Sequence, residues 1–228
     1  MKKIQLAMLS ASIIGMSATA VNAQSQFEGA YGQVGIGFQS VVPSLSNANI
    51  TSPAGERFNM GTSIDTTNSF TGTATLGYSF LVTPSFLLGF GGEYSPIAGQ
   101  SGNFSYTNSQ LNPSRISGSY KIKDSYNFFI SPGIVIDKSS VAYAKVGYTG
   151  AAIEVDGGNT NYTGYSLGLG YKKFISGNIY AFGEGNYMSY GNKTETGSGP
   201  WGGGGQYSYS STSSANVYNF LVGVGYKF

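Results

Sequence analysis

The residues whose types could perform covalent chemistry lie in the segment Gly164-Tyr165-Ser166-Leu167-Gly168. It matches the Gly-x-Ser-x-Gly pattern of serine hydrolases, in which the serine sits on a sharp turn between a strand and a helix. Such a serine needs a histidine as its base and an acid that orients the histidine. The chain contains no histidine and no cysteine. We therefore expect a non-enzymatic protein with no catalytic residues, no metal site and no cofactor.

A second match is to the dinucleotide-binding fingerprint, in Gly197-Ser198-Gly199-Pro200-Trp201-Gly202. Pro200 and the glycines that follow rule out the helix whose N-terminus would hold a pyrophosphate.

Charge also argues against a polyanion partner. The chain has 12 Lys and Arg against 10 Asp and Glu, and Lys2 and Lys3 account for the difference. We expect no nucleic-acid partner.

Three charged residues, Glu93, Lys145 and Glu184, fall on the small-residue faces of predicted strands. If those faces line a narrow interior, each ionised group needs a partner. The sequence therefore predicts a salt-bridge network formed by these three side chains. One interpretation is an ion path or gate. The other, which we favour, is a plug that fills the core.

The elements that must position these residues are eight segments in which apolar and small or polar residues alternate. Long polar stretches and short turns alternate between them, as in an up-and-down barrel with long loops on one rim. The predicted strands cover residues 27–39, 69–80, 86–94, 120–136, 142–149, 164–172, 179–187 and 218–228. The segments 40–68, 96–117 and 191–214 are predicted to be long loops, and 156–159 a shorter one.

The fourth of these strands shows the alternation on both sides of one interruption. Tyr120 and Ile122 share one predicted face with Tyr126, Phe128 and the isoleucines beyond them. Asp124 interrupts that face, so we expect the lipid-facing part to begin near Tyr126. Aromatic residues also stand near most strand ends, where they would form two girdles at the membrane interfaces. They are Tyr78, Phe80, Tyr94, Tyr126, Tyr148, Tyr171, Tyr226 and Phe228.

The last eleven residues have an apolar or aromatic side chain at every second position counted back from Phe228. This pattern is typical of the closing strand of an outer-membrane barrel. A half-buried strand of a soluble sandwich is the alternative. We expect Tyr226 and Phe228 to form the C-terminal signal that the barrel-assembly machinery reads.

The first residues are typical of a secretory signal peptide. Lys2 and Lys3 precede a short apolar stretch, and Val21-Asn22-Ala23 resembles a cleavage site. We expect residues 1–23 to be removed and residues 24–228 to form one barrel domain. No later segment is apolar for the roughly 20 residues of a spanning helix, so the mature chain can cross a bilayer only as a closed barrel.

Several segments carry a resemblance to a known family. They are Phe128-Phe129-Ile130-Ser131-Pro132-Gly133, Val141–Tyr148, Gly168-Leu169-Gly170-Tyr171 and Gly225-Tyr226-Lys227-Phe228. With them the chain resembles the small eight-stranded outer-membrane β-barrels, a porin family that includes OmpX-like, opacity-type and OmpA-barrel-like proteins. The resemblance covers essentially the whole mature chain and is specific for architecture.

The pattern and the resemblance together predict an all-β protein, an eight-stranded antiparallel up-and-down transmembrane β-barrel of the bacterial outer membrane. The expected role is structural or a surface interaction, such as adhesion, through the extracellular loops. A narrow pore for ions or small solutes is the alternative. The expected partners are outer-membrane lipid and lipopolysaccharide, the barrel-assembly machinery, and a host or surface ligand at the loops.

Overall fold

The computed structural model describes residues 26–111 and 113–228. The predicted signal peptide, residues 1–23, lies outside the described residues. The described part consists of strands joined by turns and short loops, and no helix in it is long and apolar enough to span a membrane. The strands are β1 (Gly29–Thr51), β2 (Arg57–Asn59), β3 (Gly61–Ile64), β4 (Thr67–Thr83), β5 (Phe86–Ser95), β6 (Gly102–Thr107), β7 (Arg115–Asp137), β8 (Ser140–Val155), β9 (Gly158–Ser176), β10 (Ile179–Pro200) and β11 (Gln206–Lys227).

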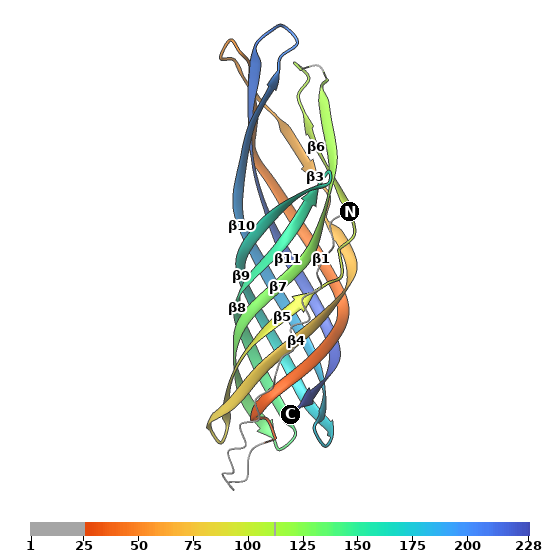
Figure 1. The fold of residues 1–228 in the computed structure, drawn as a ribbon, viewed down its shortest axis with the longest axis vertical. Helices are drawn as coiled ribbons and strands as arrows, with labels where there is room; N and C mark the ends of the chain where they lie inside the picture. Colours follow the sequence, from red (N-terminus) through yellow and green to blue (C-terminus); the bar gives the residue numbers. More distant parts are fainter. Residues whose placement is uncertain (1–25, 112) are drawn as a thin grey trace, which may run out of the picture.

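Eight of these strands close into a ring in which every pairing is antiparallel. The ring runs β1, β4, β5, β7, β8, β9, β10 and β11, and β11 pairs with β1 again, for example Tyr31 with Lys227. Figure 1 shows the resulting tall barrel of tilted strands, with β6 extending one end. The predicted eight-stranded up-and-down barrel is confirmed.

The outer surface of the barrel is apolar toward the end that carries the C-terminus. Leu76 is 70% exposed and Leu169 is 71% exposed, whereas their neighbours Thr75 and Gly168 point into the barrel. Strands with one apolar outer face and a polar inner face are typical of barrels in lipid. We call this outer zone the apolar belt. It includes Val34, Ile36, Phe70, Leu76, Phe128, Ile130, Ile134, Leu167, Leu169, Phe220, Val222 and Val224.

Aromatic side chains lie at both limits of the belt. On one side Tyr165, Tyr187 and Tyr218 form a row of ring contacts across β9, β10 and β11. On the other side the rings of Tyr226 and Phe228 are in edge contact, with 5.4 Å between their centroids. The end of the barrel that carries the short turns and the C-terminus is called the turn rim, and the opposite end the hairpin rim.

At the hairpin rim the structure corrects two loop predictions. The segment 96–117 is mostly loop, as predicted, although it contains β6, which pairs with β7. The segments 40–68 and 191–214 are mostly strand and not loop: β1 continues to Thr51, and β10 and β11 form a ladder as far as the pair Pro200 and Gln206. Their Ser-, Thr- and Gly-rich composition suits a ladder that no core covers, because the backbone supplies its hydrogen bonds. Residues 197–200, which match the dinucleotide fingerprint, belong to β10.

The predicted face of Tyr120 and Ile122 is also wrong. Both side chains point into the barrel and are about 5% and 4% exposed, whereas Phe128 on the outer face is 63% exposed. The register of β7 against β8 shifts between Lys123 and Tyr126, and Asp124 has a φ of 50°. This bulge inserts an extra residue, and a shift of one residue reverses the faces of a strand.

Candidate functional site

The alternation of the strands places Glu93 of β5, Lys145 of β8 and Glu184 of β10 inside the barrel. Their exposed fractions are 5%, 2% and 2%. On β8, Lys145 follows the buried residues Val141 and Tyr143, which lie toward the turn rim. The same strand continues past Lys145 to apolar residues that lie toward the hairpin rim. The charged residues therefore occupy the middle of the interior.

The structure brings the three predicted residues into direct contact. Lys145 Nζ lies 3.1 Å from Glu93 Oε2 and 2.7 Å from Glu184 Oε1. One ammonium thus bridges two carboxylates across the interior. Such a buried group is tolerated when the geometry is good and the remaining polar atoms also find partners.

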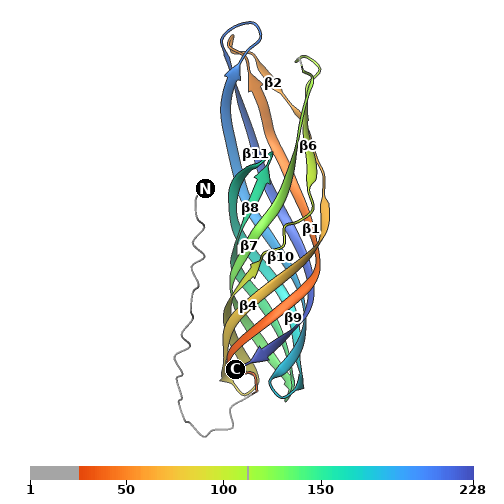
Figure 2. The same ribbon diagram turned by 45° about the vertical axis from the view of Figure 1, so that its right-hand side comes forward.

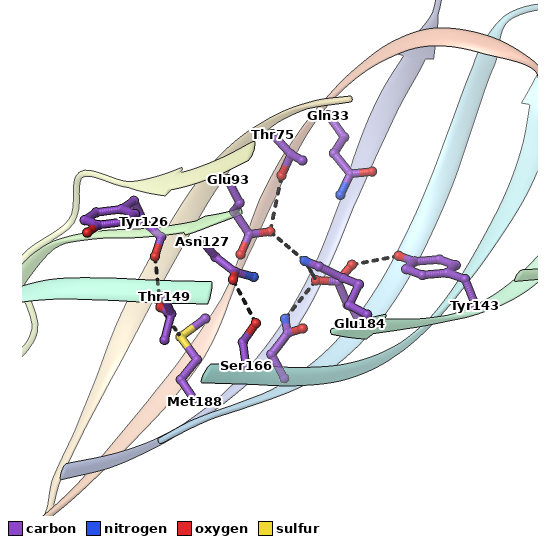
Figure 3. A network of polar contacts seen from close by, with 12 residues as sticks. Gln33, Thr75, Glu93, Tyr126, Asn127, Tyr143, Thr149, Ser166, Glu184 and Met188 are labelled. Carbon is purple, nitrogen blue, oxygen red and sulfur yellow. Dashed lines mark hydrogen bonds and ion pairs between the residues drawn. The ribbon is translucent and has the colours of Figure 1, made fainter. Parts of the chain in front are cut away.

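Neutral side chains supply those further partners, as Figure 3 shows. Thr75 donates a hydrogen bond to Glu93 Oε2 at 3.2 Å, and the Tyr143 hydroxyl donates to Glu184 Oε2 at 2.8 Å. Asn186 Nδ2 donates to Glu184 Oε1 at 2.8 Å. The charged atoms are therefore held by strands on several sides of the ring, and none of them needs water for its main contact.

Two glycines of β9 make room for this network. Gly168 pairs with Lys145 and Asn186, and Gly170 pairs with Tyr143 and Glu184. A Cβ on Gly170 would overlap the ring of Tyr143, and a Cβ on Gly168 would overlap the Asn186 amide. The strand between β8 and β10 thus leaves the space that the longer side chains fill.

Ser166, the serine of the hydrolase pattern, belongs to a continuous strand. It lies in the middle of β9, is 1% exposed, and donates a hydrogen bond to Asn127 Oδ1 at 2.7 Å. There is no strand-to-helix turn to raise its hydroxyl toward a substrate. Among the described residues, no group of three or more acidic residues is arranged to hold a metal ion either.

A second interior cation, Lys172, was not among the predicted site residues. Its ammonium lies over the ring of Tyr31 at 4.0 Å from the centroid, and over the rings of Tyr143 and Tyr180 at 5.0 and 5.2 Å. Attraction to ring faces can hold a cation that has no carboxylate in contact. The inward position of Lys172 can be read from the alternation of β9, but the three tyrosines come from other strands.

Two apolar clusters close the interior on either side of the charged residues. Toward the turn rim, a cluster contains Phe27, Tyr31, Leu87, Val141, Tyr143, Phe174, Tyr180, Phe182 and Leu221. Toward the hairpin rim, a larger one contains Val41, Tyr120, Ile122, Ala151, Ile153, Tyr162, Met188, Tyr190, Ala215 and Val217. An eight-stranded barrel has an interior that side chains can fill, and here they do.

The predicted assembly residues lie on the outer face at the turn rim. Tyr226 and Phe228 are 48% and 64% exposed. The backbone N–H of Phe228 donates to the carbonyl of Ala30, which completes the closure of β11 on β1. Both rings therefore face the surroundings of the barrel and contribute nothing to the interior network.

No family model matches the chain, and no curated protein matches it in sequence. Solved structures do match its fold. The outer membrane protein OprG from Pseudomonas aeruginosa aligns with 14% identity and a TM-score of 0.57, over 90% of this chain and 99% of OprG. The outer membrane protease OmpT from Escherichia coli aligns with 12% identity and a TM-score of 0.47, over 91% and 99% of the two chains. For Ail, the attachment invasion locus protein of Yersinia pestis, the values are 14%, 0.40, 88% and 99%.

Of these three, only OprG has a TM-score above 0.5. At 14% identity, this likeness shows a shared fold and nothing more specific. Together with the closed ring, the apolar belt and the filled interior, the likeness defines the class. The chain has the fold of the small β-barrels of the bacterial outer membrane.

Proposed function

We propose that the chain is a non-enzymatic outer-membrane surface protein, whose barrel is an anchor and whose hairpin rim contacts ligands outside the cell. The observation that carries this proposal is the contrast between the two parts of the barrel. At the level of the belt, the Glu93, Lys145 and Glu184 network and two apolar clusters fill the interior. Beyond the belt, long hairpins extend the wall at one end of the barrel (Figure 1).

The composition of the hairpin rim supports a surface role. The β10 and β11 strands extend from the pair Lys193 and Ser213 to the pair Pro200 and Gln206. This extension is rich in Ser, Thr, Tyr and Gly, residue types that offer hydrogen bonds and ring faces to a partner. The turn at its end carries Trp201, which stacks on Phe58 at 6.2 Å between centroids.

The membrane assignment can be tested on a gel. A closed ladder in a barrel unfolds slowly in detergent, so the mature protein should migrate differently before and after boiling. The cell fraction that contains it should be the outer membrane. Recovery as a plain soluble periplasmic protein would contradict the assignment.

The surface role can be tested by trimming one hairpin. We would replace Thr194–Thr212 by Asn-Gly, which retains the pair Lys193 and Ser213 and closes it with a two-residue turn. Cells that present the trimmed barrel should bind less to polystyrene and to collagen-coated surfaces than cells with the wild-type protein. The gel shift on boiling serves as the folding control. Equal binding at equal surface levels would count against the proposal.

A narrow pore is the second candidate, because charged residues stand in the interior. Planar-bilayer recordings of the refolded mature protein distinguish the two. We expect conductance at the baseline of the protein-free bilayer. A steady unitary current in the wild-type protein would favour the pore and assign the Lys145 network to an ion path.

A further inference from the structure

The wall of the barrel divides into two groups of strands above the belt. The ladder between β9 and β10 ends at Gly164 and Tyr190, and the ladder between β1 and β4 ends at Val41 and Thr67. Beyond these points β10, β11, β1 and β2 form one group, and β3, β6, β7, β8 and β9 form the other. Figure 2 shows the β6 hairpin standing apart from the β10 and β11 hairpin.

Two adjoining pockets lie between these groups. The larger has a volume of about 280 Å³ and the smaller about 80 Å³. Both are lined by Phe104 and Tyr106 of β6, Val155 of β8, Glu195 of β10 and Ser211 of β11. The smaller pocket ends on the apolar cluster at the hairpin rim. Together they reach the size of ~300 Å³ at which ligand pockets begin.

Three of the tyrosine hydroxyls at the smaller pocket are already in use. The Tyr106 hydroxyl is hydrogen-bonded to Ser211 Oγ at 3.0 Å, and the Tyr162 hydroxyl to Ser213 Oγ at 2.6 Å. The Tyr120 hydroxyl donates to the carbonyl of Asp65. What Tyr106 and Tyr120 still offer to a ligand is therefore the ring, whose face is negative in its charge distribution. The Tyr162 ring already has the Lys193 ammonium 5.7 Å from its centroid.

Glu195 is the one charged residue in the lining of both pockets. Its carboxylate accepts a hydrogen bond from Thr160 Oγ1 at 3.3 Å. Among the described residues no lysine or arginine lies within ion-pairing distance of it. Lys193 on the same strand instead donates to the carbonyl of Asn161. The carboxylate is thus available to a cation from outside.

From this arrangement we infer that the two pockets form a binding site for a small organic cation. The ligand class is an aromatic or alkyl body that carries one ammonium group, either quaternary or a protonated amine. Ring faces attract such a group within about 6 Å, a carboxylate adds Coulomb attraction, and the apolar lining accepts the body. An anion would meet Glu195 and the same negative ring faces. The site deepens the proposed function, because it makes the hairpin rim the place where the ligand binds.

The test uses the mature protein in nanodiscs of zwitterionic lipid, because detergent would compete for an apolar pocket. The probes are benzyltrimethylammonium and the anion phenylmethanesulfonate, which have similar bodies and opposite charges. Binding is followed by calorimetry and by the fluorescence of Trp201, the single tryptophan of the chain, whose ring contacts Tyr207 in the lining of the larger pocket. Empty nanodiscs are the blank.

We expect the cation to bind with one site per barrel and the anion to bind at least tenfold more weakly. Glu195→Gln should weaken binding of the cation roughly fivefold, as expected for a partly exposed ion pair. Glu56→Gln is the matched control, since Glu56 is exposed and lies outside both pockets, and it should leave binding unchanged.

Equal binding of the two probes, or an unchanged affinity in Glu195→Gln, would overturn the assignment of a cation site. Failure of both probes to bind would overturn the pocket itself. These outcomes are separate from the cell-binding test. If cells adhere through the barrel but the cation does not bind, the proposed function stands and only this binding site is excluded.

Discussion

The ammonium of Lys145 lies 2.7 Å from Glu184 Oε1, although β8 and β10 are not neighbours in the ring. The strand between them, β9, contributes Gly168 and Gly170 at this level, so the two side chains meet over a strand that has no side chains there. The contact therefore depends on two glycines as much as on the two charges. It joins the two strands that flank β9 from the inside of the wall.

Replacing the bridging lysine tests what the network does. Lys145→Met removes the ammonium and leaves two carboxylates buried together, which should lower the free energy of unfolding by about 3 to 5 kcal/mol. Urea-induced unfolding in lipid vesicles measures this change. Conductance should stay at baseline. A steady ion current without a loss of stability would mean that the network is a gate.

A triple variant separates the charges from the packing. Glu93→Gln and Glu184→Gln combined with Lys145→Met leave no charge in the network, so the triple variant should recover much of the lost stability, since a buried triad can often be replaced by neutral groups. A triple variant that is less stable than Lys145→Met alone would contradict this interpretation.

The glycines of β9 give a further prediction. Gly170→Ala places a Cβ against the ring of Tyr143, which is 7% exposed and has little room to move, and should cost about 1 to 3 kcal/mol by overpacking. Gly183→Ala is the matched control, because a Cβ there meets nothing within 4 Å. The two variants are compared by urea unfolding. Equal stabilities would mean that β9 does not need to be free of side chains at this level.

The two faces of β4 can be tested at adjacent residues. Leu76 is 70% exposed in the apolar belt, and Thr75 is 2% exposed inside the barrel. Leu76→Arg should destabilise the barrel in lipid by about 2 to 4 kcal/mol, as expected for arginine at the bilayer midplane. Thr75→Ser retains the hydroxyl that bonds Glu93 and should cost little. Similar losses in both variants would mean that the faces are assigned wrongly.

The bulge of β7 predicts a residue preference at Asp124, whose φ of 50° lies in the left-handed region. Asp124→Gly should be tolerated, whereas Asp124→Val should cost about 1 to 2 kcal/mol, because a residue with a branched Cβ is strained there. Both variants lose the hydrogen bond from the Tyr94 hydroxyl, so the loss of that bond does not contribute to their difference. The measurement is again urea unfolding. A valine variant as stable as the glycine variant would argue against the bulge.

The terminal aromatics should matter for assembly more than for the finished fold. Deleting Phe228 should reduce the amount of folded barrel in the outer membrane, since the last strand resembles the segment that the assembly machinery reads. Phe220→Leu, on the same outer face of β11 but inside the strand, is the control. Quantitative blotting of membrane fractions with and without boiling measures the effect. Wild-type levels of the deletion variant would exclude this role.

What the sequence by itself determined is the part of the fold that follows from local alternation. Successive side chains of a strand point to opposite faces, so Leu76 and Thr75 could be assigned to the two sides of the wall from their types alone. The same rule placed Glu93, Lys145 and Glu184 in the interior. It failed for Tyr120 and Ile122, because the extra residue of the bulge at Asp124 reverses the faces without changing the composition.

Only the tertiary structure decided which interior groups meet and how far the wall extends. Lys172 finds its three tyrosines, and Lys145 its two carboxylates, through the register and tilt of strands far apart in the chain. The segments 40–68 and 191–214 have the composition of loops, yet they form ladders, since antiparallel neighbours already in register can continue to pair through the backbone whatever their side chains. The pocket at Glu195 exists because those ladders separate into two groups above the belt, and no local pattern encodes that separation.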